Sequence, residues 1–148
     1  MHLQQVTYIS AIVALGLVSV SNGLGINCRG SSMCSTGDVL TAQNLRNSIN
    51  GLPDDKYFKS GEHIACDPAG LANPIPWAPR IGGSICAFVQ NKDGLNGKEL
   101  KRLAQFIVDH GCKMCGSVPT DFPDKNDVKN GELTFNYVAK PKCREGLC

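Results

Sequence analysis

The cysteines restrict the fold of this chain more than any other feature of its sequence. The chain has 148 residues and eight cysteines, and all eight lie after residue 27. An even number, with none in the apolar N-terminal stretch, indicates paired thiols and an oxidising compartment. One group lies early, at Cys28 and Cys34, and another lies late, at Cys112 and Cys115. Together the two groups indicate a disulfide staple that holds a small secreted domain.

The first 23 residues have the pattern of a secretory signal peptide. Residues 9–20 are an apolar run of suitable length, and Ser21 and Gly23 are small residues at positions −3 and −1 of a cut before Leu24. The alternative is a membrane anchor, but this run is too short to span a bilayer. We therefore expect a signal peptide at 1–23, one domain at 24–148, secretion to the extracellular space and no stable membrane insertion.

The charge balance excludes one large class of function. Fifteen Lys and Arg against 13 Asp and Glu give a net charge of +2, and the sequence contains no block of like charge. Because nucleic-acid-binding domains carry strongly basic segments, we expect no nucleic-acid partner. A domain over 24–148 is long enough to bury a hydrophobic core, so its disulfides would reinforce the core and not replace it.

Two amphipathic helices are predicted from apolar residues spaced three and four apart. The first is expected to start near Asp38, with Ser35 or Thr36 as its cap, and to end at Asn50. Its apolar face consists of Val39, Ala42, Leu45 and Ile49. The second is expected from Gly97 to His110, with a core stripe of Leu100, Leu103, Ala104 and Ile107. Gly111 follows at the position where a glycine commonly ends a helix.

Three strands are predicted between and after the helices. Residues 63–66 are a short candidate, and residues 84–90 form an apolar run typical of a buried strand. Residues 133–138 are the third candidate, and the first five of them alternate apolar and polar side chains. They follow Asn130 and Gly131, which are a two-residue hairpin signal. Helices interleaved with such strands predict the α+β class: a two-layer α/β sandwich in which an antiparallel sheet carries both helices on one face.

Residues 67–80 are rich in proline and contain the chain's one tryptophan, Trp77. This stretch holds four of the eight prolines, and proline lacks the N–H group that helices and central strands need. We expect a loop here. Trp77 either packs back on the domain, as large aromatic side chains usually do, or lies exposed on the loop.

Cys112 and Cys115 form a CxxC pair, which elsewhere is a redox dithiol or half of a zinc site. A redox cysteine is activated at a helix N-terminus, whereas this pair follows the C-terminal end of the second helix, where the dipole acts in the opposite sense. A zinc site needs a second such pair or a close pair of histidines, and the sequence has neither. We therefore expect structural disulfides, with no metal and no cofactor.

The histidines give no sign of a catalytic centre. Covalent catalysis needs a nucleophile with an adjacent base, and His2, His63 and His110 show no pairing with a candidate nucleophile. We therefore expect no catalytic residues, and a protein that acts by binding and not as an enzyme.

Four segments of the sequence resemble the KP-four killer toxin family. They are residues 24–34, 85–90, 108–117 and 126–138, and they include both members of each cysteine group. The segments occur in the family's order and span nearly all of 24–148. Agreement at several spaced segments is far more specific than one short motif.

The resemblance implies a fold and an activity. The family fold is an α/β sandwich with an antiparallel sheet and a pair of antiparallel helices, held by disulfides. The family activity is inhibition of the growth of competing fungal or host cells by a secreted monomer, which binds a surface protein and blocks voltage-gated calcium channels. The alternative that the resemblance leaves open is a secreted effector or virulence factor with a non-channel partner.

The resemblance also implies a disulfide pairing. Cys28 and Cys34 are expected to bond Cys112 and Cys115, in that order. The remaining four cysteines are Cys66, Cys86, Cys143 and Cys148. Of these, Cys66 is expected to bond one of the two C-terminal cysteines, and Cys86 the other.

One functional feature of the family is missing here. The family has a strongly basic stretch, with a lysine linked to activity, just before the cysteine that corresponds to Cys66. Here residues 61–65 contain no lysine. A cation-channel blocker usually presents a basic group to the channel mouth, so we expect a substitute patch at one sheet edge. Its candidate members are Lys56, Lys59, Lys140, Lys142 and Arg144. The loop with Trp77 is the next candidate for target binding.

Overall fold

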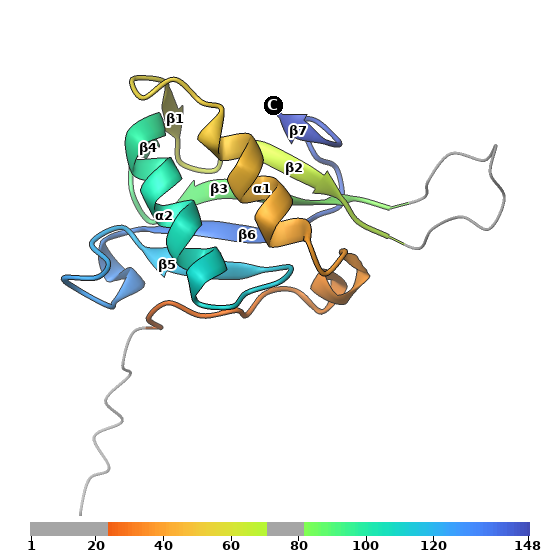
Figure 1. Cartoon of the computed structure of the whole chain (residues 1–148), viewed down its shortest axis with the longest axis horizontal. Coiled ribbons are helices and arrows are strands. Elements are labelled where there is room, and N and C mark those ends of the chain that lie inside the picture. Colours follow the sequence, from red (N-terminus) through yellow and green to blue (C-terminus); the bar gives the residue numbers. More distant parts are fainter. Residues whose placement is uncertain (1–23, 71–81) are drawn as a thin grey trace, which may run out of the picture.

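A five-stranded antiparallel sheet forms one layer of the fold, and two helices lie on one of its faces (Figure 1). The computed structural model describes residues 24–70 and 82–148. The helical elements are η1 (Ser32–Thr36), α1 (Thr41–Asn50), α2 (Gly97–Asp109) and η2 (Val128–Asn130). The strands are β1 (Tyr57–Lys59), β2 (Ala65–Pro68), β3 (Ser84–Gln90), β4 (Gly94–Asn96), β5 (Gly116–Pro119), β6 (Glu132–Val138) and β7 (Gly146–Leu147). The α+β class expected from the sequence is confirmed.

The sheet has the strand order β5-β6-β3-β2-β7. Its centre is the β3–β6 pair, in register from Ser84 opposite Val138 to Gln90 opposite Glu132. A single bridge between Asn27 and β5 attaches the N-terminal segment beyond the outer strand. The short strands β1 and β4 form a separate two-stranded ribbon.

Alternation along the two central strands separates the face of the sheet that the helices cover from the opposite face. Ile85, Ala87 and Val89 of β3 are completely buried, as are Leu133 and Phe135 of β6. In a strand these positions share one face, and it is the face covered by α1 and α2 (Figure 1). The intervening residues, which include one cysteine of β3, therefore lie on the opposite face of the sheet.

Helix α2 follows its predicted course. The expected core stripe is completely buried: Leu100, Leu103, Ala104 and Ile107. The Asn96 side chain accepts the Glu99 backbone N–H, and the Glu99 side chain accepts the Asn96 N–H, so this helix begins with a reciprocal capping box. Gly111 has a φ of 90°, the left-handed conformation that glycine adopts readily where a helix ends.

The predicted start of the first helix is wrong. Helix α1 begins at Thr41, and Val39, expected on its buried face, is 62% exposed. Ser35 and Thr36 do not cap it, because both belong to η1. The Asp38 carboxylate accepts the backbone N–H of Leu40, and such a local side-chain bond stabilises a turn in place of a first helical turn.

The strand predictions hold where the pattern is long and fail where it is short. Strands β1, β4, β5 and β7 were not predicted, and the candidate at 63–66 is displaced to β2. Asp67 and Pro68 belong to β2 and pair with β3, so the expectation of a loop from residue 67 onwards is wrong for these two residues. They have no partner in β7, which pairs with β2 only at Ala65 and Cys66. The two-residue hairpin is also wrong: Asn130 belongs to η2, and residues 120–131 connect β5 to β6.

Two predicted features fall outside the described residues. They are the signal peptide at 1–23 and most of the proline-rich loop, including Trp77. Within residues 24–70 and 82–148, no helix combines the length and apolar character needed to cross a membrane.

Two substitutions in and before α1 test its register. Ile49→Ala removes a completely buried side chain and should lower the free energy of unfolding by about 2–5 kcal/mol. Val39→Ala should change it by less than about 0.5 kcal/mol, as is usual for exposed sites. Urea unfolding followed by circular dichroism measures both. Equal losses for the two variants would contradict the start of the helix at Thr41.

Candidate functional site

Two disulfides attach the N-terminal segment to the junction between α2 and β5. Cys28 bonds Cys112 and Cys34 bonds Cys115, with Cα–Cα distances of 5.1 Å and 5.9 Å. This is the order that the family resemblance implies. Because the two cysteines of the CxxC pair bond different partners, they are joined to the N-terminal segment and not to each other.

The other two pairings differ from the expectation. The structure joins Cys66 to Cys86 and Cys143 to Cys148, whereas each of the first two was expected to bond a C-terminal cysteine. The reason lies in the sheet register, which sets Cys66 directly opposite Cys86 in the β2–β3 ladder with their Cα atoms 4.1 Å apart. Directly opposed side chains lie on the same face of a sheet.

Two of the five predicted basic residues meet at one corner of the sheet. Glu62 joins them: one of its carboxylate oxygens accepts the backbone N–H of Lys59 at 3.1 Å, and the other lies 3.9 Å from Lys142 Nζ. The backbone N–H of Lys142 donates to Nδ1 of His63 at 3.0 Å. We call Lys59, Glu62, His63 and Lys142 the basic corner.

The basic corner is assembled by backbone pairing and not by the expected disulfide. Strand β7 pairs with β2, with Gly146 opposite Cys66. This pairing brings the C-terminal segment alongside the residues that precede β2. An open hollow adjoins the corner, and His63 lines it together with Ser60, Phe88 and Val138.

The other predicted basic residues do not join this corner. The Lys56 ammonium lies 5.7 Å from the centre of the Phe58 ring. Arg144 lines a separate hollow with three acidic side chains, Asp38, Asp67 and Glu145. Lys140 is exposed, and Trp77 is not among the described residues.

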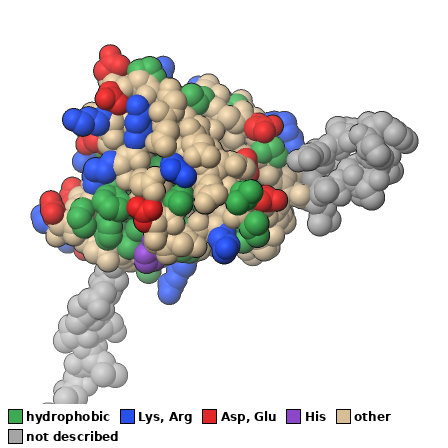
Figure 2. Space-filling view, in the orientation of Figure 1, with side chains coloured by type: hydrophobic (Ala, Val, Ile, Leu, Met, Phe, Trp, Pro, Cys, Tyr) green, Lys and Arg blue, Asp and Glu red, His purple; other side chains and the backbone are tan. Residues whose placement is uncertain are grey.

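Charges of both signs are mixed over the helix-covered side of the molecule. Figure 2 shows Lys and Arg side chains scattered among Asp and Glu on this face. One close pair is Lys101 with Asp54, at 2.8 Å, and the hydrogen bond from Lys101 together with its charge lowers the pKa of the Asp54 carboxyl. At the start of β6, burial raises the pKa of Glu132, and a hydrogen bond with Ser117 opposes the rise. Neither group belongs to the basic corner.

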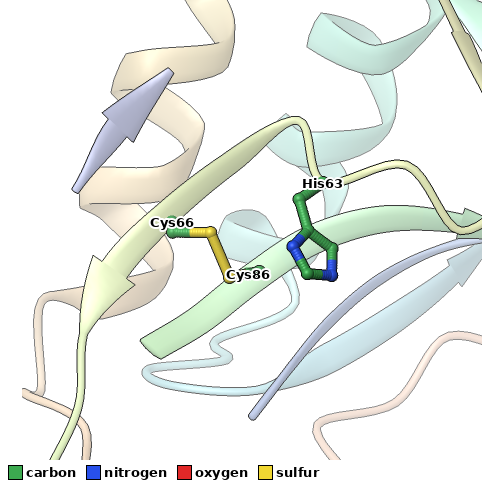
Figure 3. A group of neighbouring side chains, drawn as sticks. All are labelled: His63, Cys66 and Cys86. Carbon is green, nitrogen blue, oxygen red and sulfur yellow. A yellow bond between two sulfur atoms is a disulfide. The ribbon is translucent and has the colours of Figure 1, made fainter. Parts of the chain in front are cut away.

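His63, Cys66 and Cys86 lie together on the side of the sheet opposite the helices (Figure 3). Their ligand atoms are within 4.8 Å of one another. Metals bind the cysteine thiolate, and the two sulfur atoms are bonded to each other. In the disulfide state this group is therefore not a set of metal ligands.

The chain matches known proteins over most of its length. A family model described as Kp4 matches residues 11–139. The KP4 killer toxin of Ustilago maydis P4 virus is 35% identical over an alignment 147 residues long, and the match covers 93% of this chain and 98% of the viral protein. The similarity therefore extends over nearly the whole length of both chains, and it includes the segments that form the sheet, the helices and the disulfides.

Removing one disulfide that closes a long loop and one that closes a short loop tests which of the two stabilises the fold more. The Cys34→Ala/Cys115→Ala variant opens a bond between residues 81 apart and should lose about 4–5 kcal/mol in the chain-entropy model. The Cys143→Ala/Cys148→Ala variant opens one between residues five apart and should lose about 2 kcal/mol. Urea unfolding of both variants and the parent gives the comparison. A larger loss of unfolding free energy on removal of Cys143–Cys148 would contradict the view that the bonds to the N-terminal segment stabilise the fold more.

Proposed function

The chain belongs to the Kp4 killer toxin family, and we propose that it is a secreted toxin that inhibits the growth of competing fungal or host cells. It would act as a monomer that binds a protein on the target-cell surface, without catalysis. The match to a killer toxin along nearly the full length of both chains carries this proposal.

Export follows from the same proposal. We propose a signal peptide at 1–23, cleaved between Gly23 and Leu24, and a toxin domain at 24–148. Four disulfides join all the cysteines of the described residues, and disulfides persist in extracellular surroundings. This supports an extracellular site of action.

The proposed target is a voltage-gated calcium channel, and the proposed contact is the basic corner. The mouth of a cation-passing channel is lined by acidic side chains or carbonyl groups, which attract a lysine. Lys59 is exposed, and the Lys142 side chain is 60% exposed. Both lie beside residues 61–65, where the family has its basic stretch.

One observation favours the alternative, a secreted effector with a non-channel partner. Glu62 is one of residues 61–65, which correspond to the family's basic stretch. Its carboxylate lies close to both lysines of the corner, so it reduces the local positive potential. Added external calcium separates the two functions. It should relieve growth inhibition by a calcium-channel blocker and leave inhibition by the effector unchanged.

Charge reversal at the corner tests the contact. Lys59→Glu/Lys142→Glu should abolish growth inhibition of sensitive cells, because two attractive charges become repulsive at the acidic mouth of a channel. Stability should change by less than about 1 kcal/mol, since surface ion pairs contribute little. A dilution series on a sensitive fungal strain measures activity, and circular dichroism checks folding.

A matched variant controls for total charge. Lys113 and Lys125 are exposed and lie outside the corner, so Lys113→Glu/Lys125→Glu changes the net charge by the same amount at another place. This control should inhibit growth as the parent does. If the corner variant is folded and equally toxic, the basic corner is not the working surface.

A further inference from the structure

Two separate disulfides touch each other at the C-terminal edge of the sheet. Cys66 is bonded to Cys86 and Cys148 to Cys143, yet the Sγ atoms of Cys66 and Cys148 are only 3.6 Å apart. The Sγ atom of Cys143 also lies within 4.8 Å of both. Reacting atoms held about 3–3.5 Å apart are close to the geometry of attack, so a thiolate at Cys148 would lie almost in contact with the neighbouring disulfide.

The two disulfides differ in their access to solvent. Cys66 and Cys86 are 2% and 0% exposed, whereas Cys143 is half-buried and Cys148 is exposed. A small thiol in solution therefore reaches the outer bond and not the inner one. Attack on a disulfide requires such access. The inner bond is open to attack only from within the protein, by the sulfur of Cys148.

We propose that this corner is a thiol–disulfide exchange site whose reactant is a small monothiol of the glutathione type. The monothiol anion attacks Cys143 Sγ, forms a mixed disulfide there and releases Cys148 as a thiolate. The Cys148 thiolate attacks Cys66 Sγ, which forms a Cys66–Cys148 bond and releases Cys86 as a thiolate. The Cys86 thiolate then attacks Cys143 Sγ and expels the monothiol anion.

The sum of these steps is an isomerisation. Cys66–Cys86 and Cys143–Cys148 become Cys66–Cys148 and Cys86–Cys143, and the monothiol is regenerated. Two disulfides are present before and after, so no net oxidation or reduction occurs. The monothiol acts as a catalyst, and an amount well below that of the protein is sufficient.

Backbone pairing keeps Cys148 in place after its own disulfide has opened. Residues 146 and 147 of β7 remain paired with β2, and the backbone N–H of Cys148 donates to the Ile64 carbonyl at 2.9 Å. These bonds do not involve sulfur. The freed thiolate is therefore held beside Cys66 and does not diffuse away with the chain end.

Nearby basic groups favour the thiolates that the exchange needs. A ring nitrogen of His63 lies within 4.8 Å of the sulfur atoms of Cys66 and Cys86, as Figure 3 shows for the three side chains. A polar side chain therefore borders the sulfur of Cys86, which leaves as a thiolate. Lys142 and Arg144 flank Cys143 in the sequence, and adjacent positive charge stabilises a thiolate.

Peptide mapping distinguishes the two pairings directly. Trypsin cleaves after lysine and arginine, so cleavage separates the four cysteines into residues 60–80, 81–92, 143–144 and 145–148. The purified oxidised protein is incubated with glutathione at about one tenth of its concentration. Free thiols are then blocked with N-ethylmaleimide before digestion without reductant. The bonds Cys28–Cys112 and Cys34–Cys115 in the same digest are internal references.

The expected result is a growing population of two linked peptide pairs. Peptide 60–80 is linked to 145–148, which reports Cys66–Cys148, and peptide 81–92 is linked to 143–144, which reports Cys86–Cys143. The two reference bonds stay unchanged. Retention of the starting pairs alone overturns the proposal, whether or not glutathione forms a mixed disulfide. Cys143→Ala gives a second test, because it leaves Cys148 unpaired. In that variant Cys66–Cys148 should form without added thiol, and N-ethylmaleimide added together with denaturant, which exposes the buried Cys86, should label Cys86. Labelling of Cys148 alone contradicts the exchange.

Discussion

The two disulfides from Cys28 and Cys34 to the α2–β5 junction hold a segment that has almost no core of its own. No residue from 24 to 36 is buried. A single backbone bridge at Asn27 and a few hydrogen bonds, such as that from the Ser31 N–H to Asn136, are its other attachments. Contacts of this kind contribute about 1 kcal/mol each. Covalent closure of two long loops therefore fixes the N-terminal segment along the edge of the sheet.

Long patterns in the sequence predicted the structure well, and short ones did not. Helix α2 lies within one residue of its expected bounds because it repeats one periodicity over 13 residues, and strand β3 has its expected bounds because its apolar run is seven residues long. Strands β1, β4 and β5 have three or four residues, too few to show alternation. Their extended conformation depends on partners far away in the chain. The start of α1 was missed because the Asp38 turn competes with the helix locally.

The candidate site shows the same limit more strongly. The meeting of Lys59 with Lys142 was expected from a disulfide that the structure does not contain, and it is produced by β7 lying on β2. Spacing in the sequence could not reveal that Glu62 lies between the two lysines, nor that Arg144 turns toward acidic residues. The same strand pairing also brings two disulfides into contact. One feature of topology thus creates both the basic corner and the sulfur cluster.

Whole-cell recording of calcium currents tests the proposed toxic mechanism most directly. Protoplasts of a sensitive fungus are depolarised to activate their voltage-gated calcium current, and the purified protein of residues 24–148 is then applied outside the cell. A channel blocker reduces the inward current reversibly, at the concentrations that stop growth, and we expect this result. An unchanged current at concentrations that fully inhibit growth would contradict the account and favour a non-channel partner.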